Sequence, residues 1–185
     1  MSGADRSRWR LDGQLALVTG GSAGIGRAIT SELLGFGARV LIAARDGDAL
    51  EAAREELLDE HPDGDVRALI ADVADDEQRR ELLDGVEVQG EGLHILVNNA
   101  GGNLSKAAVD YTEDEWREIF EVNLFSAFEL NRYAHPLLAQ HAASCIVNVG
   151  SVSGAIISPS GTIWSSRSRS SRSLLLKRTE ESVVR

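Results

Sequence analysis

The stretch QLALVTGGSAGIG, residues 14–26, decides the fold of this chain. Its first half is an apolar, strand-like run, and its second half has glycines at positions 20, 21, 24 and 26. Glycine lacks a Cβ atom, so this segment can turn tightly and let a ligand approach the backbone closely. A helical pattern follows to about residue 36, and a helix N-terminus presents N–H groups and a positive dipole end. Strand, glycine turn and helix together predict a phosphate-binding site, whereas glycines alone would be typical of any flexible turn.

A short apolar run followed by a longer helical pattern recurs along the chain. The expected strands cover residues 14–20, 38–44, 65–72, 93–101 and 144–151, and the expected helices cover residues 24–36, 48–60, 75–86 and 112–140. Continuous apolar strands are typical of a parallel sheet that helices cover on both faces. With right-handed crossovers, we predict an α/β fold, a Rossmann-like doubly wound parallel sheet of strand order 3-2-1-4-5. Ligands of such sheets bind beyond the carboxyl ends of the strands, near the switch point between strands 1 and 4. Thr112 and Glu115 have the spacing of a capping box at the start of the last helix.

The composition is that of one acidic domain. The 185 residues are 43% hydrophobic and have a net charge of −10, with the acidic excess in residues 1–163. An acidic body repels phosphate groups, so we expect no nucleic acid partner. We expect neither a secretory signal nor a membrane span, because the apolar runs are too short, and we therefore expect a cytoplasmic protein. The single Cys145 lies in an apolar run and is expected in the core, and the four histidines lack metal-ligand spacing, so we expect no metal.

Several further motifs coincide with the expected strand ends. TGGSAGIG (residues 19–26) ends strand 1, Asp72 and Val73 end strand 3, NNAG (residues 98–101) ends strand 4, Asn123 lies in FEVNLFSAF, and Ser151 follows strand 5. In this order, the motifs resemble those of the short-chain dehydrogenase/reductase family. The segment RWRLDGQLALVTGG (residues 8–21) is similar to the tropinone-reductase-like subgroup of that family.

The resemblance implies an oxidoreductase that moves a hydride between a nicotinamide dinucleotide and a carbonyl or secondary alcohol of a small molecule. By the same resemblance, Ser151 would hold the substrate oxygen and Asn123 would support a proton-relay water. The implied cofactor-binding residues are Thr19, Gly20, Ser22, Gly24, Ile25 and Gly26 in the glycine turn, Arg45 after strand 2, Asp72 and Val73 at the adenine, and Asn99, Ala100 and Gly101 along the cleft. Members of the family are usually homo-oligomeric, whereas the sequence leaves the oligomeric state of this chain open.

The end of strand 2 bears on which cofactor is used. An acidic residue about 20 positions after the glycine turn would bind the ribose 2′-OH of NAD. Ala44 stands there instead, and Arg45 follows it, which can pair with the extra phosphate of NADP. We therefore favour NADP(H) over NAD(H). The neighbouring Asp46 weakens this signal, and the alternative is that Arg45 is only a solvated charge.

The resemblance breaks at the catalytic tyrosine and lysine. In the family, the tyrosine stands thirteen residues after the serine and the lysine four residues later, where the lysine lowers the phenol pKa. Trp164 and Ser168 occupy these positions here. An indole N–H donates a hydrogen bond but does not titrate near neutral pH, and we expect neither Tyr111 nor Tyr133 to replace the missing phenol. We expect this chain to be inactive. The alternative is a non-catalytic nucleotide-binding fragment or an unstable truncated product.

Residues 164–185 differ in composition from the rest of the chain, because serine and arginine dominate them. We interpret this tail as aberrant, the result of a reading-frame change, and as disordered. Residues 1–163 would then form an NADP-binding Rossmann-fold domain that lacks the last strands and helices of the fold. Strand 5 would be a bare, apolar sheet edge. The alternative interpretation is a genuine basic arm for nucleic acid or for phosphorylation.

Overall fold

The computed structural model describes residues 9–90 and 92–151. The chain divides into two compact units. The first comprises Met1–Gly101 and Glu121–Val149, and the second comprises Gly102–Phe120 and Gly150–Arg185. All five strands of the sheet belong to the first unit.

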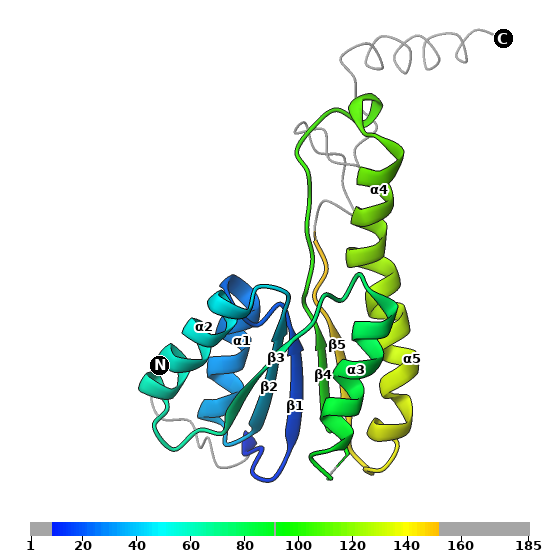
Figure 1. Cartoon of the computed structure of the whole chain (residues 1–185). Coiled ribbons are helices and arrows are strands. Elements are labelled where there is room, and N and C mark those ends of the chain that lie inside the picture. Colours follow the sequence, from blue (N-terminus) through cyan, green and yellow to red (C-terminus); the bar gives the residue numbers. More distant parts are fainter. Residues whose placement is uncertain (1–8, 91, 152–185) are drawn as a thin grey trace, which may run out of the picture. The chain divides into compact units, whose positions relative to one another are not determined.

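The first unit is a parallel α/β sheet with strand order β3-β2-β1-β4-β5 (Figure 1). Its strands are β1 (Leu15–Thr19), β2 (Arg39–Ala44), β3 (Val66–Ile70), β4 (Ile95–Asn98) and β5 (Cys145–Asn148). Its helices are α1 (Gly24–Gly35), α2 (Gly47–Glu60), α3 (Asp76–Glu87), the π-helical turn η3 (Glu121–Phe125) and α5 (Ser126–Leu138). Every strand pairing is parallel. The order and the alternation confirm the predicted Rossmann-like, doubly wound architecture for the described part of the chain.

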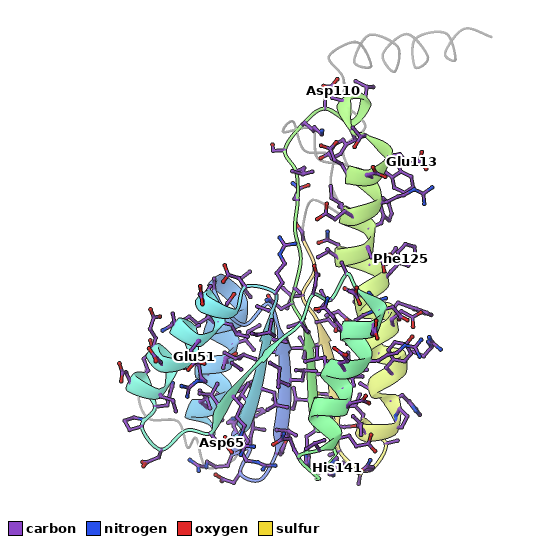
Figure 2. The ribbon with its side chains drawn as sticks, viewed as in Figure 1. Glu51, Asp65, Asp110, Glu113, Phe125 and His141 are labelled. Carbon is purple, nitrogen blue, oxygen red and sulfur yellow. The ribbon has the colours of Figure 1, made fainter. Side chains whose placement is uncertain are left out.

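Helix α2 illustrates how the sequence pattern orients a helix. Leu50, Ala53 and Leu57 recur at helical spacing, and all three are buried. Glu51 lies on the opposite, solvent-facing side, where it forms an ion pair with Arg54 (Figure 2). The apolar stripe of α2 therefore faces the sheet, and its acidic residues face water.

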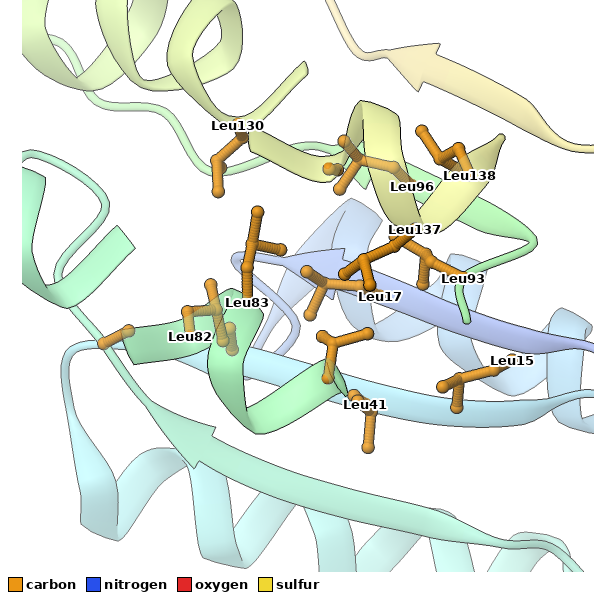
Figure 3. Close-up of a cluster of buried hydrophobic side chains, with 14 of the residues drawn as sticks. Leu15, Leu17, Leu41, Leu82, Leu83, Leu93, Leu96, Leu130, Leu137 and Leu138 are labelled. Carbon is orange, nitrogen blue, oxygen red and sulfur yellow. The ribbon is translucent and has the colours of Figure 1, made fainter. Parts of the chain in front are cut away.

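The two faces of the sheet have separate hydrophobic clusters, because successive residues of a strand point to opposite sides. Val18 of β1 belongs to the cluster that includes Leu50 of α2. Its neighbour Leu17 belongs to the other cluster, with Leu83 of α3 and Leu130 of α5 (Figure 3). Helices α1 and α2 thus cover one face, and α3 and α5 cover the other (Figure 1).

The pairing register brings the carboxyl ends of the central strands together. Thr19 at the end of β1 pairs with Ala43 of β2. Val18 pairs with Ile42 of β2 on one side and with Val97 of β4 on the other. Because the strands are parallel, the turns that follow β1, β2 and β4 leave the sheet at the same edge.

The second unit contains a 3-10 turn, η2 (Ala108–Asp110), and the helix α4 (Glu113–Phe120). The Thr112 N–H donates to Oε2 of Glu115 at 2.8 Å, and the Glu115 N–H donates to Oγ1 of Thr112 at 3.3 Å. This reciprocal pair confirms the predicted capping box. Lys106 adds an ion pair to the Glu115 carboxylate.

The stretch predicted as helical, residues 112–140, is helical over most of its length but is not one regular α-helix. Residues Glu121–Phe125 form the π-helical turn η3 between α4 and α5. Within this region the Ser126 hydroxyl donates to the Val122 carbonyl oxygen at 2.5 Å. A serine that bonds to the carbonyl four residues earlier competes with the backbone ladder and bends helices. The irregular turn includes Asn123, one of the predicted site residues.

The prediction that Cys145 fills the core is also wrong, since this cysteine is exposed. All four residues of β5 are exposed, including Ile146 at 41% and Val147 at 43%. The reason is the position of β5 at the end of the strand order, where in the described residues it pairs with β4 alone. An apolar run in an edge strand does not become buried unless another element covers it.

Candidate functional site

The turn after β1 has glycine where the backbone conformation requires it. Gly20 and Gly24 have φ values of +67° and +54°, in the left-handed region that favours glycine. Helix α1 begins at Gly24, and no side chain caps its N-cap residue, Ala23. The starts of α2 and α3, by contrast, are capped by the carboxylates of Asp46 and Asp75. The positive end of α1 thus lacks the cap that the other two helices have, which suits it to an anion.

Two other glycines allow close packing around this turn. A Cβ atom on Gly26 would lie 2.2 Å from the Gly20 carbonyl oxygen and 2.5 Å from Nδ2 of Asn99. A Cβ atom on Gly21 would lie 2.7 Å from Cβ of Ile42. Neither position has room for a side chain, so α1 starts directly against the strand ends.

Hydrogen bonds through Thr19 fasten the turn to the end of β4. The Thr19 hydroxyl is buried, donates to the Val97 carbonyl at 3.3 Å, and accepts the N–H groups of Asn99 and Ala100, both at 3.0 Å. Nδ2 of Asn99 donates to the carbonyls of Thr19 at 3.0 Å and Gly20 at 3.2 Å. We term this set of contacts between Thr19, Gly20, Val97, Asn99 and Ala100 the turn lock. It joins the first and fourth strand-end motifs, which lie 80 residues apart in sequence.

The end of β2 presents a guanidinium to solvent. Arg45 follows β2 directly and is exposed. The neighbouring carboxylate is directed elsewhere, because Oδ1 of Asp46 accepts the Ala49 N–H at 3.0 Å and caps α2. The acidic neighbour that weakened the sequence signal therefore has a structural role in the next helix.

The segment after β3 is held by two side chains of α3. Oδ1 of Asp72 accepts the Ala74 N–H at 2.9 Å, and the Asp72 N–H donates to Oε1 of Gln78 at 2.9 Å. Val73 is buried, and its carbonyl accepts Nη1 of Arg79 at 2.6 Å. The sequence analysis did not single out Gln78 or Arg79, because polar residues at the start of a helix are usually solvated. The signal that could have identified Arg79 is its position on the buried face of α3, where an apolar residue is expected.

Asn123 lies close to the NNAG motif. It belongs to η3 and is exposed, and a Cβ atom on Gly101 would lie 2.8 Å from its Oδ1. The glycine at position 101 thus lets the asparagine side chain approach the backbone that follows β4. The structure brings these two predicted residues together.

Three asparagines meet at the ends of β4 and β5, and the sequence analysis missed two of them. Nδ2 of the buried Asn98 donates to Oδ1 of Asn131 at 2.7 Å and to Oδ1 of Asn148 at 2.8 Å. Its own Oδ1 is buried without a partner in the part of the chain that the structure describes. The cluster joins α5 to both strands. The three residues are 33 and 50 positions apart, so no local pattern indicates the contact.

The remaining predicted residues are accounted for as follows. Ser22 is half-buried in the glycine turn, and Ile25 is exposed on α1. Ser151 is exposed and belongs to the second unit. Trp164 and Ser168 lie outside the described residues, as does the whole predicted tail. The residues predicted to bind the cofactor therefore all belong to the first unit.

The chain contains two tyrosines, and both phenols have fixed partners. The Tyr133 hydroxyl donates to Oδ1 of Asp76 at 2.9 Å and accepts Nη2 of Arg80 at 2.7 Å. Partial desolvation and the bond to Asp76 raise the pKa of Tyr133 above its usual value. In the second unit, the Tyr111 hydroxyl donates to the Leu104 carbonyl. Both phenolic hydroxyls therefore form hydrogen bonds within their own unit, and that neither tyrosine acts as a general acid stays a prediction.

Residues 9–90 and 92–151 contain neither a candidate metal site nor a candidate membrane-spanning helix. These ranges contain no cluster of three or more His, Cys, Asp and Glu side chains that could hold a metal ion. None of their helices has both the length and the apolar character required to span a membrane.

Comparisons of the sequence with known proteins identify a matching family and several relatives. The family model described as short chain dehydrogenase matches residues 14–169. A curated tropinone reductase homologue of Arabidopsis thaliana is 42% identical over 154 residues, which cover 82% of this chain and 56% of the relative. Another, named as chloroplastic, is 44% identical over 151 residues, which cover 80% of this chain and 46% of the relative. The chain spans about half the length of these curated relatives.

Solved structures give the same result. RhlG of Pseudomonas aeruginosa, in a complex with NADP, superposes with a TM-score of 0.78 at 32% identity, covering 94% of this chain and 70% of that one. L-sorbose reductase of Gluconobacter frateurii, complexed with NADPH and L-sorbose, superposes with a TM-score of 0.74 at 28% identity. That match covers 78% of this chain and 55% of the reductase.

Proposed function

Since the chain belongs to the short-chain dehydrogenase family, we propose that its first unit binds NADP(H) beyond the carboxyl ends of the strands. The proposed reaction of the enzyme is hydride transfer between NADP(H) and a carbonyl or secondary alcohol. The cofactor, when bound, supplies or accepts the hydride. The tropinone reductase homologues among the relatives, and the NADP and NADPH complexes among the structural neighbours, support this assignment.

The turn lock beside the uncapped start of α1 is the observation that carries the proposal. The residues present fit a pyrophosphate group, because a Cβ atom on Gly24 would meet nothing within 4 Å, so this side of the turn is open. Gly20, Ser22, Gly24, Ile25 and Gly26 would hold the pyrophosphate. Asp72 and Val73 would contact the adenine, and Thr19, Asn99, Ala100 and Gly101 would shape the cleft.

We prefer NADP(H) to NAD(H) because of the charges at the end of β2. The exposed guanidinium of Arg45 can donate two hydrogen bonds to a phosphate. The Asp46 carboxylate, which would repel that phosphate, is bonded to the Ala49 N–H. These observations support the proposal that the guanidinium pairs with the 2′-phosphate of a bound nucleotide.

The catalytic part of the proposed site lacks two residues of the family pattern. Ser151 would hold the substrate oxygen, and Asn123 would support a proton-relay water. Trp164 and Ser168 stand where the family has tyrosine and lysine, so no titrating phenol is supplied there. We therefore propose that this chain binds the nucleotide without turning over a substrate. Nucleotide binding without catalysis is thus the second candidate function beside the oxidoreductase reaction, and Trp164 at the tyrosine position is the observation that favours it.

Fluorescence titration with NADPH and with NADH tests the cofactor assignment. We expect NADPH to bind more tightly, and Arg45→Ala to weaken NADPH about 10-fold or more, since a hydrogen bond to a charged group contributes about 1.5–3 kcal/mol. NADH binding should be unchanged. Arg67→Ala removes an exposed guanidinium from β3 and serves as the matched control. Equal losses for both nucleotides in Arg45→Ala would refute the assigned role.

NADPH oxidation with a panel of ketones tests the catalytic expectation. We expect no turnover above background in the parent chain. Turnover that persists in Ser151→Ala would contradict the roles proposed for Ser151 and for the tyrosine position.

The setting of the protein is likewise proposed. We propose that residues 1–163 are the functional domain, that it has neither nucleic acid nor membrane partners, and that it lies in the cytoplasm. Members of the family are usually homo-oligomeric. The acidic composition supports the absence of a nucleic acid partner. For the location, one relative is named as chloroplastic. Cell fractionation and size-exclusion chromatography with light scattering check location and oligomeric state.

A further inference from the structure

Arg79 is a buried cation in the first turn of α3. Its side chain is 4% exposed, and its Nη1 donates to the Val73 carbonyl oxygen at 2.6 Å. The same Nη1 lies 3.3 Å from Oε1 of Glu121, and Nη2 lies 3.4 Å from Oδ1 of Asp76. Burying a guanidinium is costly unless hydrogen bonds and opposite charges compensate. A position that only filled space would favour an apolar side chain, so the contacts of Arg79 require an explanation.

The groups that Arg79 joins belong to two different segments of the proposed cofactor site. Val73 follows β3 and, with Asp72, forms the segment assigned to the adenine. Glu121 is the first residue of η3, which also contains Asn123. The two contacts connect Arg79 to residues 6 and 42 positions away in sequence. One side chain thus reaches both segments.

The chemistry of the guanidinium suits this bridging position. Its planar fork donates in several fixed directions at once, which the single ammonium of lysine does not reproduce. Asp76, which faces Nη2, is itself held by the Tyr133 hydroxyl at 2.9 Å and by Arg80 at 3.0 Å. Within the described residues, Nε of Arg79 is buried without a partner, so the side chain is held through its two terminal nitrogens.

We propose that Arg79 is a positioning residue that couples the segment of Asp72 and Val73 to the turn that carries Asn123. The inference rests on the proposed NADP(H) site, although the buried Arg79 is not among the residues proposed to contact the cofactor. Ordering the adenine segment fixes the Val73 carbonyl, the carbonyl fixes the guanidinium, and the guanidinium fixes Glu121. Nucleotide binding at one segment thereby orders the other, as a coupling free energy between two sites requires.

Hydrogen exchange measured by mass spectrometry on the full chain tests the coupling. The amides to follow are those of residues 71–75 and of residues 121–126. Arg79→Lys keeps the charge and loses the fork, and it should raise exchange at 121–126 by about fivefold or more in the free chain, the lower end of typical site coupling. Arg54→Lys is the matched control, since it makes the same replacement at an arginine of α2 whose ion-pair partner, Glu51, lies outside both segments. It should leave both segments unchanged.

A second variant and a second condition complete the test. Glu121→Gln weakens the link from its other end and should also raise exchange at 121–126, which protects the test if Arg79→Lys does not fold. With NADPH, the parent should be protected at both segments and Arg79→Lys only at 71–75. Parent-like exchange at 121–126 in both variants overturns the coupling. A parent chain that does not bind NADPH refutes the proposed function, whereas the comparison of free chains still decides the role of Arg79.

Discussion

We expect the Thr19→Val variant to unfold at a much lower urea concentration than the parent chain. Valine has the same branched shape as threonine, so the substitution removes the hydroxyl from the turn lock without opening a large cavity. The Val97 carbonyl loses a donor, and the N–H groups of Asn99 and Ala100 lose their acceptor. Because Thr19 is only 1% exposed, water cannot simply take the place of its hydroxyl.

The two abandoned N–H groups determine the size of the effect. A buried donor without a partner costs about 1–3 kcal/mol, and Asn99 and Ala100 are half-buried, so we expect a total loss of about 3 kcal/mol. With a urea dependence of about 2 kcal/mol per molar, the unfolding midpoint should fall by about 1.5 M.

Thr30→Val provides the matched control for this experiment. Thr30 is also fully buried, but its hydroxyl donates to a helical carbonyl, that of Gly26, at 2.9 Å. Its removal orphans no N–H group, so the loss should be about 1 kcal/mol or less. Urea unfolding followed by circular dichroism measures both variants. Equal midpoints for Thr19→Val and Thr30→Val would refute the argument that the Thr19 hydroxyl stabilises the fold by accepting two N–H groups.

Two further predictions concern packing and pH. Gly26→Ala should lower the free energy of unfolding by about 2 kcal/mol, because its Cβ would lie 2.2 Å from the Gly20 carbonyl oxygen and overpacking typically costs about 1–3 kcal/mol. Gly35→Ala in the same helix has ordinary contacts and should be neutral or stabilising, so a thermal melt showing equal effects would contradict the clash. The hydrogen bond from Tyr133 lowers the pKa of Asp76. The ionised Asp76 therefore stabilises the folded state at pH values above the usual carboxyl pKa of about 4. This contribution is lost as the pH falls through the lowered pKa. Asp76→Asn should therefore show a smaller fall in its urea midpoint than the parent between about pH 5 and about pH 2, and an identical fall would exclude the contribution.

The sequence allowed the sheet to be predicted because its strands have a strong, local signal. The apolar runs around β1 and β4 are buried along their whole length, and the glycines at 20 and 24 mark the turn that leaves β1. Handedness rules then leave few possible strand orders. The contact between the glycine turn and Asn99 followed from the sheet order, since parallel strands end at one edge.

The parts that could not be predicted depend on contacts between distant segments. The helical periodicity around Asn123 does not indicate the π-helical turn. The turn coincides with a hydrogen bond from the Ser126 side chain to a backbone carbonyl. Arg79 reads as one more polar residue of an amphipathic helix, and its burial depends on a partner 42 residues away. Cys145 lies in a strong apolar run, but an apolar run does not specify whether its strand will be central or at the edge.

The turn lock and Arg45 belong to different strands, and this separation has a consequence for how such a protein can change. The lock connects β1 to β4, whereas Arg45 follows β2 and takes no part in the lock's hydrogen bonds. A substitution at position 45 therefore alters the charge offered at the sheet edge while the frame that shapes the turn stays the same. A single substitution at position 45 can therefore change that charge without removing any hydrogen bond of the turn lock.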